Sequence, residues 1–184
     1  MSKRTTLLAA VASLAFAASA VAQDNPMVGG APMFSNKNIV ENAVNSKDHT
    51  TLVAAVKAAG LVDTLSGKGP FTVFAPTNAA FAKLPAGTVE TLVKPENKVM
   101  LTKILTCHVV ATNALSSAIN KMIADDQGAH PVKTVGGCVL QAKKVGNKIT
   151  LTDEKGGVAT VTIADVRQSN GVIHVIDSVL LPAS

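Results

Sequence analysis

A histidine and an aspartate lie close together near the C-terminal end of the chain, in the otherwise apolar run GVIHVIDSVLLP (residues 171–182). His174 and Asp177 are residue types that a hydrolase uses as a base and as the acid that orients it. The run has the composition of a strand, whose side chains alternate between its two faces. Because the two residues are three positions apart, they point to opposite faces and cannot pair. We therefore interpret both as structural polar groups, with His174 bonded to a partner beside the core.

A second histidine, His108, lies in the apolar sequence ILTCHVV and permits the same two interpretations. With a serine it would form part of a catalytic triad. The sequence has no G-x-S-x-G motif, and no serine lies in a strand-turn-helix context. Nothing in the sequence assembles a nucleophile, a base and oxyanion donors. An extracellular hydrolase therefore ranks last among the functions considered, and no catalytic residue is predicted.

A metal site is also disfavoured by the spacing of the candidate ligands. Asp125, Asp126 and His130 lie close together, but a calcium loop needs several oxygen ligands at fixed spacing with a closing glutamate, and none follows here. We interpret the two aspartates as a solvated pair that ends a helix. No metal site is predicted.

The first 22 residues have the pattern of a secretory signal peptide. Lys3 and Arg4 precede an Ala-rich apolar stretch, and Ala20-Val21-Ala22 precedes Gln23, which predicts cleavage after Ala22. The apolar stretch is short, and no later segment approaches the roughly 20 apolar residues of a membrane span. The mature chain is therefore expected to be secreted or periplasmic, with no transmembrane segment.

Composition excludes several classes of partner. Loss of Lys3 and Arg4 with the signal lowers the formal net charge from +5 to +3, which is only mildly basic. Tyr and Trp are absent and four Phe remain after the signal, which disfavours the aromatic platforms on which bases or sugars stack. Arg167 is the one arginine after the signal, which disfavours base reading and bidentate capture of phosphate. No nucleic-acid partner is predicted.

The two cysteines are expected to form a structural disulfide. Cys107 and Cys138 both lie in strand-like sequence, and a disulfide is the default for a cysteine pair in an exported chain. Free thiols are the alternative. A redox site is poorly supported because the sequence has no C-x-x-C motif.

Helical patterns come first in the chain and strand patterns last. A Gly- and Pro-rich lead-in (23–36) precedes the domain (37–184). Residues 51–59 have helical spacing, with Asp48 or Thr50 as the predicted N-cap and Gly60 as the predicted C-cap. Residues 71–75 predict a strand, Thr77 caps the next helical turn, and residues 114–124 predict an amphipathic helix. After Gly128 the pattern changes to period two, over PVKTV, CVLQA, KITLT, VATVTI and VIHVID. This order points to an α+β domain.

Two blocks of sequence resemble the signatures of fasciclin-like domains. They are TLVAAVKAAGLVDTLSGKGPFTVFAPTNAAFAKLP (51–85) and ATVTIADVRQSNGVIHVIDSVLLP (159–182), with ILTCHVV between them in the place of the family's central Tyr-His strand. The resemblance covers residues 37–182 and is closest to single-domain, bacterial secreted members. It implies a β-sandwich wedge with several helices packed along it.

The resemblance also implies a non-enzymatic module for cell adhesion or extracellular matrix interaction. Its partner would be a cell-surface or matrix protein or a polysaccharide. The family's proposed contact segments lie around the Tyr-His strand, where this chain has Cys107-His108, and around an Asp-Ile pair, where it has Asp165-Val166. The expected partner-binding residues are His108, Asn113, Asp165, Val166, Arg167 and Asn170.

An alternative function is the carriage of a small apolar ligand. Some members of the family are implied to hold carotenoid-type pigments, the one cofactor considered for this chain. Methionine adapts its shape to irregular ligands, so Met27, Met33 and Phe34 in the lead-in could form a lid over an apolar groove.

Overall fold

A single mixed sheet forms the centre of the molecule. The computed structural model describes residues 25–183, so the predicted signal peptide (1–22) lies outside the described residues. Seven strands pair in the order β4-β3-β9-β8-β7-β6-β5. Neighbours are antiparallel except β3 and β9, which are parallel. The strands are β3 (Phe71–Pro76), β4 (Val109–Val110), β5 (Ala129–Lys133), β6 (Val139–Val145), β7 (Lys148–Thr152), β8 (Val158–Gln168) and β9 (Gly171–Ile176).

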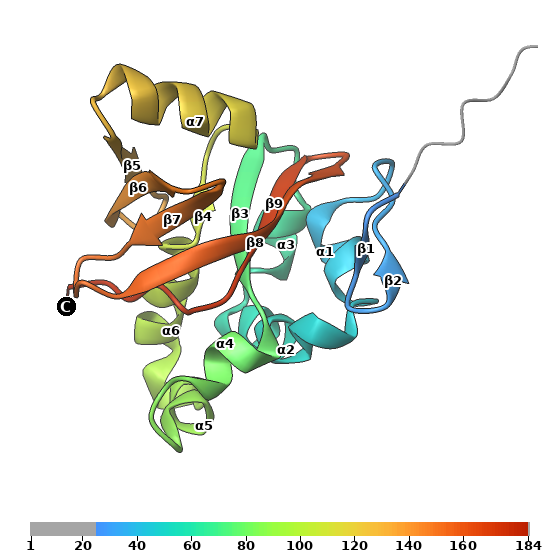
Figure 1. Cartoon of the computed structure of the whole chain (residues 1–184). Helices are drawn as coiled ribbons and strands as arrows, with labels where there is room; N and C mark the ends of the chain where they lie inside the picture. Colours follow the sequence, from blue (N-terminus) through green and yellow to red (C-terminus); the bar gives the residue numbers. More distant parts are fainter. Residues whose placement is uncertain (1–24, 184) are drawn as a thin grey trace, which may run out of the picture.

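Strand β8 joins the two halves of this sheet (Figure 1). Its pairing with β9 shifts register twice, between Val161 and Ile163 and between Ile163 and Val166. Such bulges bend a strand and increase its twist. The halves consequently enclose one apolar core, in which Phe74 of β3 packs with Leu140 of β6 and other buried residues. The expected α+β wedge is confirmed.

Helices enclose a second apolar core against β3 and β9. The helices are α1 (Ile39–Ala43), α2 (Thr50–Ala59), α3 (Val62–Ser66), α4 (Asn78–Ala82), α5 (Thr88–Leu92), α6 (Lys98–Thr106) and α7 (Ser116–Asp125). Side chains from α1 to α6 contribute to this second core. Helix α7 instead packs against β5 and β6. The helix predicted over 114–124 is α7.

The helix ends match the sequence predictions in part. Gly60 ends α2 in the left-handed conformation, with φ +73°, and the Thr77 hydroxyl accepts a hydrogen bond from the Ala80 amide at 3.2 Å. The predicted N-cap of α2, Asp48 or Thr50, is wrong. His49 occupies the cap position, and the side-chain oxygen of Asn78 accepts from the Thr51 amide at 3.0 Å. The cap is therefore supplied by a distant residue that sequence spacing cannot reveal.

The lead-in segment packs on the domain. Residues Met27–Val28 (β1) and Ala31–Pro32 (β2) form a small hairpin, which lies beside α1 in Figure 1. Val28 is buried in the helical core, and the buried Asn42 side chain hydrogen-bonds both the amide and the carbonyl of Phe34, at 3.1 and 2.7 Å.

The predicted disulfide is confirmed. Cys107 at the end of α6 is bonded to Cys138 at the start of β6, with their Cα atoms 5.4 Å apart. Both cysteines are buried. The bond ties the helical layer to the far half of the sheet.

Candidate binding surface

An open polar groove of about 320 Å³ lies at the end of the sheet where β8 turns back into β9. Three segments that are far apart in the sequence line it: the loop before β3, the loop after β4 and the β8–β9 turn. The lining includes Lys68, Pro70, Asn113, Gln168, Ser169 and Asn170. Asn113 and Asn170, predicted separately from the sequence, therefore meet at one site.

The first wall of the groove is fixed by a buried threonine. The Thr72 hydroxyl donates to the Thr112 carbonyl at 2.6 Å and accepts from the Ala114 amide at 2.8 Å. These two bonds bracket Asn113, which is exposed and whose side chain has no partner within residues 25–183. Asn113 is consequently presented to solvent from a loop whose backbone is held on both sides.

His174 and Asp165 also fix the loop that carries Asn113. His174 Nε2 donates to the Ala114 carbonyl at 2.8 Å, and Nδ1 accepts from the Asp165 amide at 3.2 Å. The Asp165 carboxylate accepts from the Ser116 amide at 2.6 Å and from the Ser116 hydroxyl. The Asp165 carboxylate thus accepts from an amide in the first turn of α7, where backbone N–H groups have no acceptor within the helix.

The second wall is held by Asn170. Its side-chain nitrogen donates to the Leu65 and Gly67 carbonyls, at 2.8 and 2.9 Å, and its oxygen accepts from the Ile39 amide at 3.0 Å. A Cβ on Gly69 would lie 2.1 Å from the Asn170 carbonyl oxygen, so the backbone can approach closely only with glycine there. The wall that carries Lys68 is therefore rigidly positioned.

His108 is a structural group in the core. Its Nδ1 donates to the Ile104 carbonyl at 2.8 Å, and its Nε2 accepts from the Leu180 amide at 2.9 Å. Burial lowers the pKa of His108 to about 4, against the opposing effects of the Ile104 carbonyl and the Asp153 charge. Both ring nitrogens are thus occupied by the backbone, and the ring is neutral at physiological pH.

Burial also lowers the pKa of His174, although the Ala114 carbonyl and the Asp165 charge act in the other direction. Asp177 accepts from the Thr160 amide at 2.8 Å and lies 3.8 Å from the Lys83 ammonium. The side chains of His174 and Asp177 thus both bond to backbone groups, and Asp177 lies one residue beyond the end of β9.

The match to a family model decides the identity of the domain. The model for the fasciclin domain matches residues 47–182. The chain belongs to the fasciclin domain family.

Named relatives agree with this assignment. This fasciclin domain is 48% identical over 170 residues to protein sll1483 of Synechocystis. The aligned region covers 92% of this chain and 87% of that protein. It is 38% identical over 145 residues to the cell surface glycolipoprotein MPB83 of Mycobacterium bovis, covering 76% of this chain and 58% of that protein. A solved fasciclin domain pair from the insect cell adhesion molecule fasciclin I has a similar fold, with a TM-score of 0.68 at 18% identity, over 79% of this chain and 51% of that chain.

The six partner-binding residues predicted for the fasciclin domain occupy different environments. Asn113 and Arg167 are exposed, and Asp165 and Asn170 are half-buried and bonded to the backbone. Val166 and His108 are buried, at 0% and 2% exposure, so neither can touch a partner at this surface. Val166 turns inward because the bulges in β8 change which residues face the core.

Sequence reasoning missed four residues of this surface. Lys68 and Ser169 are exposed in the groove, the buried Gln168 closes its base, and Thr72 fixes the Asn113 loop. The one signal for Thr72 was a polar residue inside the apolar strand FTVFA. The sequence around Lys68 and Ser169 carried no signal, because the two residues come together only when their separate loops meet at the groove.

One serine does approach a histidine. Ser46 Oγ lies 2.9 Å from His49 Nδ1, and both residues are buried. The adjacent void measures about 20 Å³, and the Gly29 backbone packs so closely on Ser46 that a Cβ there would lie 2.3 Å from the hydroxyl. A substrate cannot reach this hydroxyl, and no carboxylate hydrogen-bonds to His49 in the part of the chain that the structure describes. The pair packs the hairpin against α1.

The acidic residues at the C-terminal end of α7 do not gather around a common point. His130 Nδ1 lies 2.7 Å from an Asp126 oxygen, and Lys121 pairs with Asp125 at 2.6 Å. Within residues 25–183, no three His, Cys, Asp or Glu side chains come together as metal ligands.

The predicted lid residues also separate. Met33 is buried and lines the 20 Å³ void, Phe34 is half-buried under the Lys37 ammonium, and Met27 is 59% exposed. Across the described residues, no helix is long and apolar enough to span a bilayer.

Proposed function

We propose that this fasciclin domain is an exported, non-enzymatic binding module that attaches to a protein or polysaccharide at the cell surface or in the surrounding matrix. The contact is made at the polar groove, through Asn113, Lys68 and Ser169. The observation that carries the proposal is that hydrogen bonds fix both walls of the groove, while the side chain of Asn113 on the first wall has no partner within residues 25–183. A surface that is held in its bound shape loses little entropy when it binds.

Two further points support this proposal. One relative is named a cell surface glycolipoprotein, and the similar solved fold comes from a cell adhesion molecule. The nitrogens of His108 and His174 are bonded to the backbone, which leaves neither free to move a proton in a reaction.

Binding of purified mature protein to host cells, matrix proteins and cell-surface polysaccharide tests the proposal. Asn113→Ala and Lys68→Ala together should weaken binding at least tenfold with an unchanged melting temperature, because neither side chain supports the fold. Asn147→Ala on the β6–β7 turn, together with Lys144→Ala at the exposed end of β6, is the matched control and should bind normally. Equal binding by both double variants would exclude the groove as the contact site.

The carriage of a carotenoid-type pigment stays a second prediction. Met33 in the wall of an apolar void supports it, but a pigment requires α1 and the β1–β2 hairpin to move apart, since that void measures only about 20 Å³. Mass spectrometry of an organic extract of protein from its own host tests for the pigment. A colourless protein that also rejects added carotenoid would exclude this function.

A further inference from the structure

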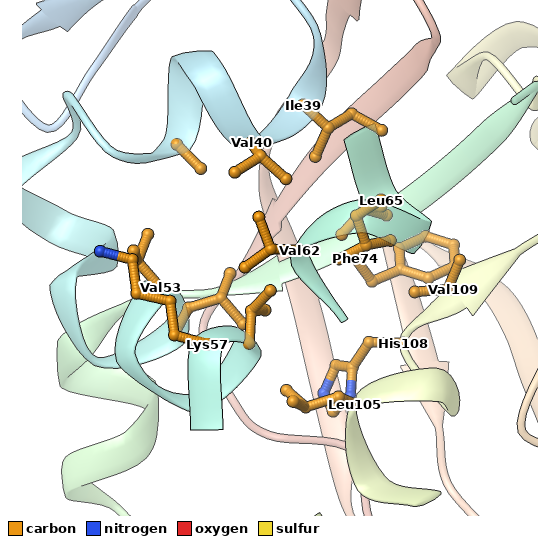
Figure 2. Close-up of a pocket in the computed structure, with 14 residues that line it drawn as sticks. Ile39, Val40, Val53, Lys57, Val62, Leu65, Phe74, Leu105, His108 and Val109 are labelled. Carbon is orange, nitrogen blue, oxygen red and sulfur yellow. The ribbon is translucent and has the colours of Figure 1, made fainter. Parts of the chain in front are cut away.

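A partly enclosed apolar cavity of about 40 Å³ lies between α1, α2, α3 and β3 (Figure 2). A smaller void of about 20 Å³ shares four of its lining residues, namely Ile39, Ala43, Leu52 and Val73. The two are therefore adjacent lobes under α1. They lie in the helical layer and share no lining residue with the polar groove.

The cavity has one closed end and one end that reaches solvent. Phe74, Leu105 and His108 at the closed end are buried. Val40, Val53 and Val62 are half-buried and Lys57 is exposed, and these four lie together on the opposite side in Figure 2. A molecule can therefore enter between α1 and α2 and extend toward Phe74.

The closed end offers no polar partner. The two ring nitrogens of His108 are already bonded to the Ile104 carbonyl and the Leu180 amide. An unpaired polar group placed there would be desolvated without compensation, and water would lack the partners it needs. Only an apolar chain end fits at this depth.

The open end carries a positive charge. The Lys57 stem lines the cavity while its ammonium points away from the other labelled side chains in Figure 2. No hydrogen bond or ion pair joins this ammonium to another residue within 25–183. The cavity lining includes no acidic residue. An anionic group at the opening would thus meet one unpaired cation.

We infer that the cavity binds a free, short-chain aliphatic carboxylate, with its methyl end against Phe74 and Leu105 and its carboxylate at Lys57. Since each water-sized group takes roughly 10–15 Å³ of such volume, the 40 Å³ lobe that runs from Lys57 to Phe74 holds about three or four carbon groups. The acyl chain of a membrane lipid is longer than that. This small-molecule site is independent of the proposed surface binding.

A chain-length series of carboxylates from acetate to decanoate tests the inference. Affinity is measured from chemical-shift changes of valine and leucine methyl groups in the full mature protein. Each methylene that enters should tighten binding about fourfold, up to about four carbons beyond the carboxylate, after which affinity stops rising. No dependence on chain length, or a rise that continues through decanoate, would overturn the inference. Phosphatidylglycerol vesicles should not shift the same methyl groups, and shifts with vesicles would assign the cavity to membrane lipid instead.

Two variants test the geometry. Lys57→Gln should weaken carboxylates about threefold and leave alcohols of equal chain length unchanged, because only the ion pair is lost. Lys144→Gln, at the exposed end of β6, is the matched control. Ala43→Leu fills space between the two lobes with a larger side chain and should abolish binding of acids and alcohols alike. If Ala43→Leu is unstable, Val53→Leu is a second variant that fills the cavity. Normal binding by a folded filling variant, or equal losses in Lys57→Gln and Lys144→Gln, would contradict the site.

Discussion

At the scale of single residues, polar groups in this domain divide into those that hold backbone and those that face solvent. Asp165 and Asn170 both lie beside the groove, yet their side chains are bonded to backbone groups of α7 and of the α1 and α3 regions. Asn113 has no such bond. Substitutions at the first two residues therefore alter the fold, and only those at exposed positions such as Asn113 isolate recognition.

Asp165→Ala is expected to lower the free energy of unfolding by about 1–3 kcal/mol, because it leaves the Ser116 amide unpaired at the start of α7. Asp165 also has φ +59°, a conformation that alanine disfavours and that asparagine and glycine tolerate better. Asp165→Asn should consequently lose least, and Asp165→Gly should recover part of the loss seen with alanine. Urea denaturation gives the values, with Asn113→Ala as the control. An alanine variant as stable as the parent would contradict a structural role for this carboxylate.

At the scale of secondary-structure elements, the disulfide and β8 decide how the two layers meet. The bond between Cys107 and Cys138 links the end of α6 to the start of β6 across a sequence separation of 31. The C-terminal segment after β9 has no strand partner, and side chains satisfy its amides instead. His108 accepts from Leu180, and Asp153 from Leu181, both at 2.9 Å.

The double variant Cys107→Ser, Cys138→Ser is expected to lower the free energy of unfolding by about 3–4 kcal/mol, because the unfolded chain gains the freedom of a loop of this length. Urea denaturation of the variant and of the oxidised parent measures the difference. Both cysteines are buried, so mild reductant should leave the folded parent oxidised. If the free energy of unfolding fell by less than about 1 kcal/mol, the disulfide would not stabilise the fold by lowering the entropy of the unfolded chain.

At the scale of the whole molecule, three buried histidines make the fold sensitive to acid. Burial lowers the pKa of His49, His108 and His174 below 6.5 in the folded state. Above pH 6.5 these rings are neutral whether the chain is folded or not. Below it the unfolded chain binds protons that the folded protein does not, so acid favours unfolding.

The free energy of unfolding should therefore fall as the pH decreases from 6.5. His108 alone contributes a loss of about 3 kcal/mol by the time the pH reaches about 4, where its folded form also protonates. Chemical denaturation between pH 7 and 4.5 covers the range in which the unfolded histidines bind protons, whereas most of the contribution of Glu154, whose pKa is lowered from 4.5, is lost below that range. His108→Gln should flatten the profile. An unchanged slope in this variant would contradict the assignment to His108.

The sequence by itself determined the features that depend on neighbouring residues. Helical spacing located α2 and α7, and the left-handed requirement placed Gly60 at a helix end. Two long signature blocks identified the family. These signals are local, because backbone geometry fixes where the side chains of adjacent residues point.

Only the tertiary structure decided which distant residues meet. The parallel pairing of β3 with β9 brings the loops of Lys68, Asn113 and Ser169 to one groove, and Asn78 caps a helix that precedes it in the chain. Val166 faces inward because the bulges shift the alternation along β8, which a strict count of two along the sequence cannot anticipate. Such positions are set by long-range packing and register, whose free energy is shared among many residues and leaves no local pattern.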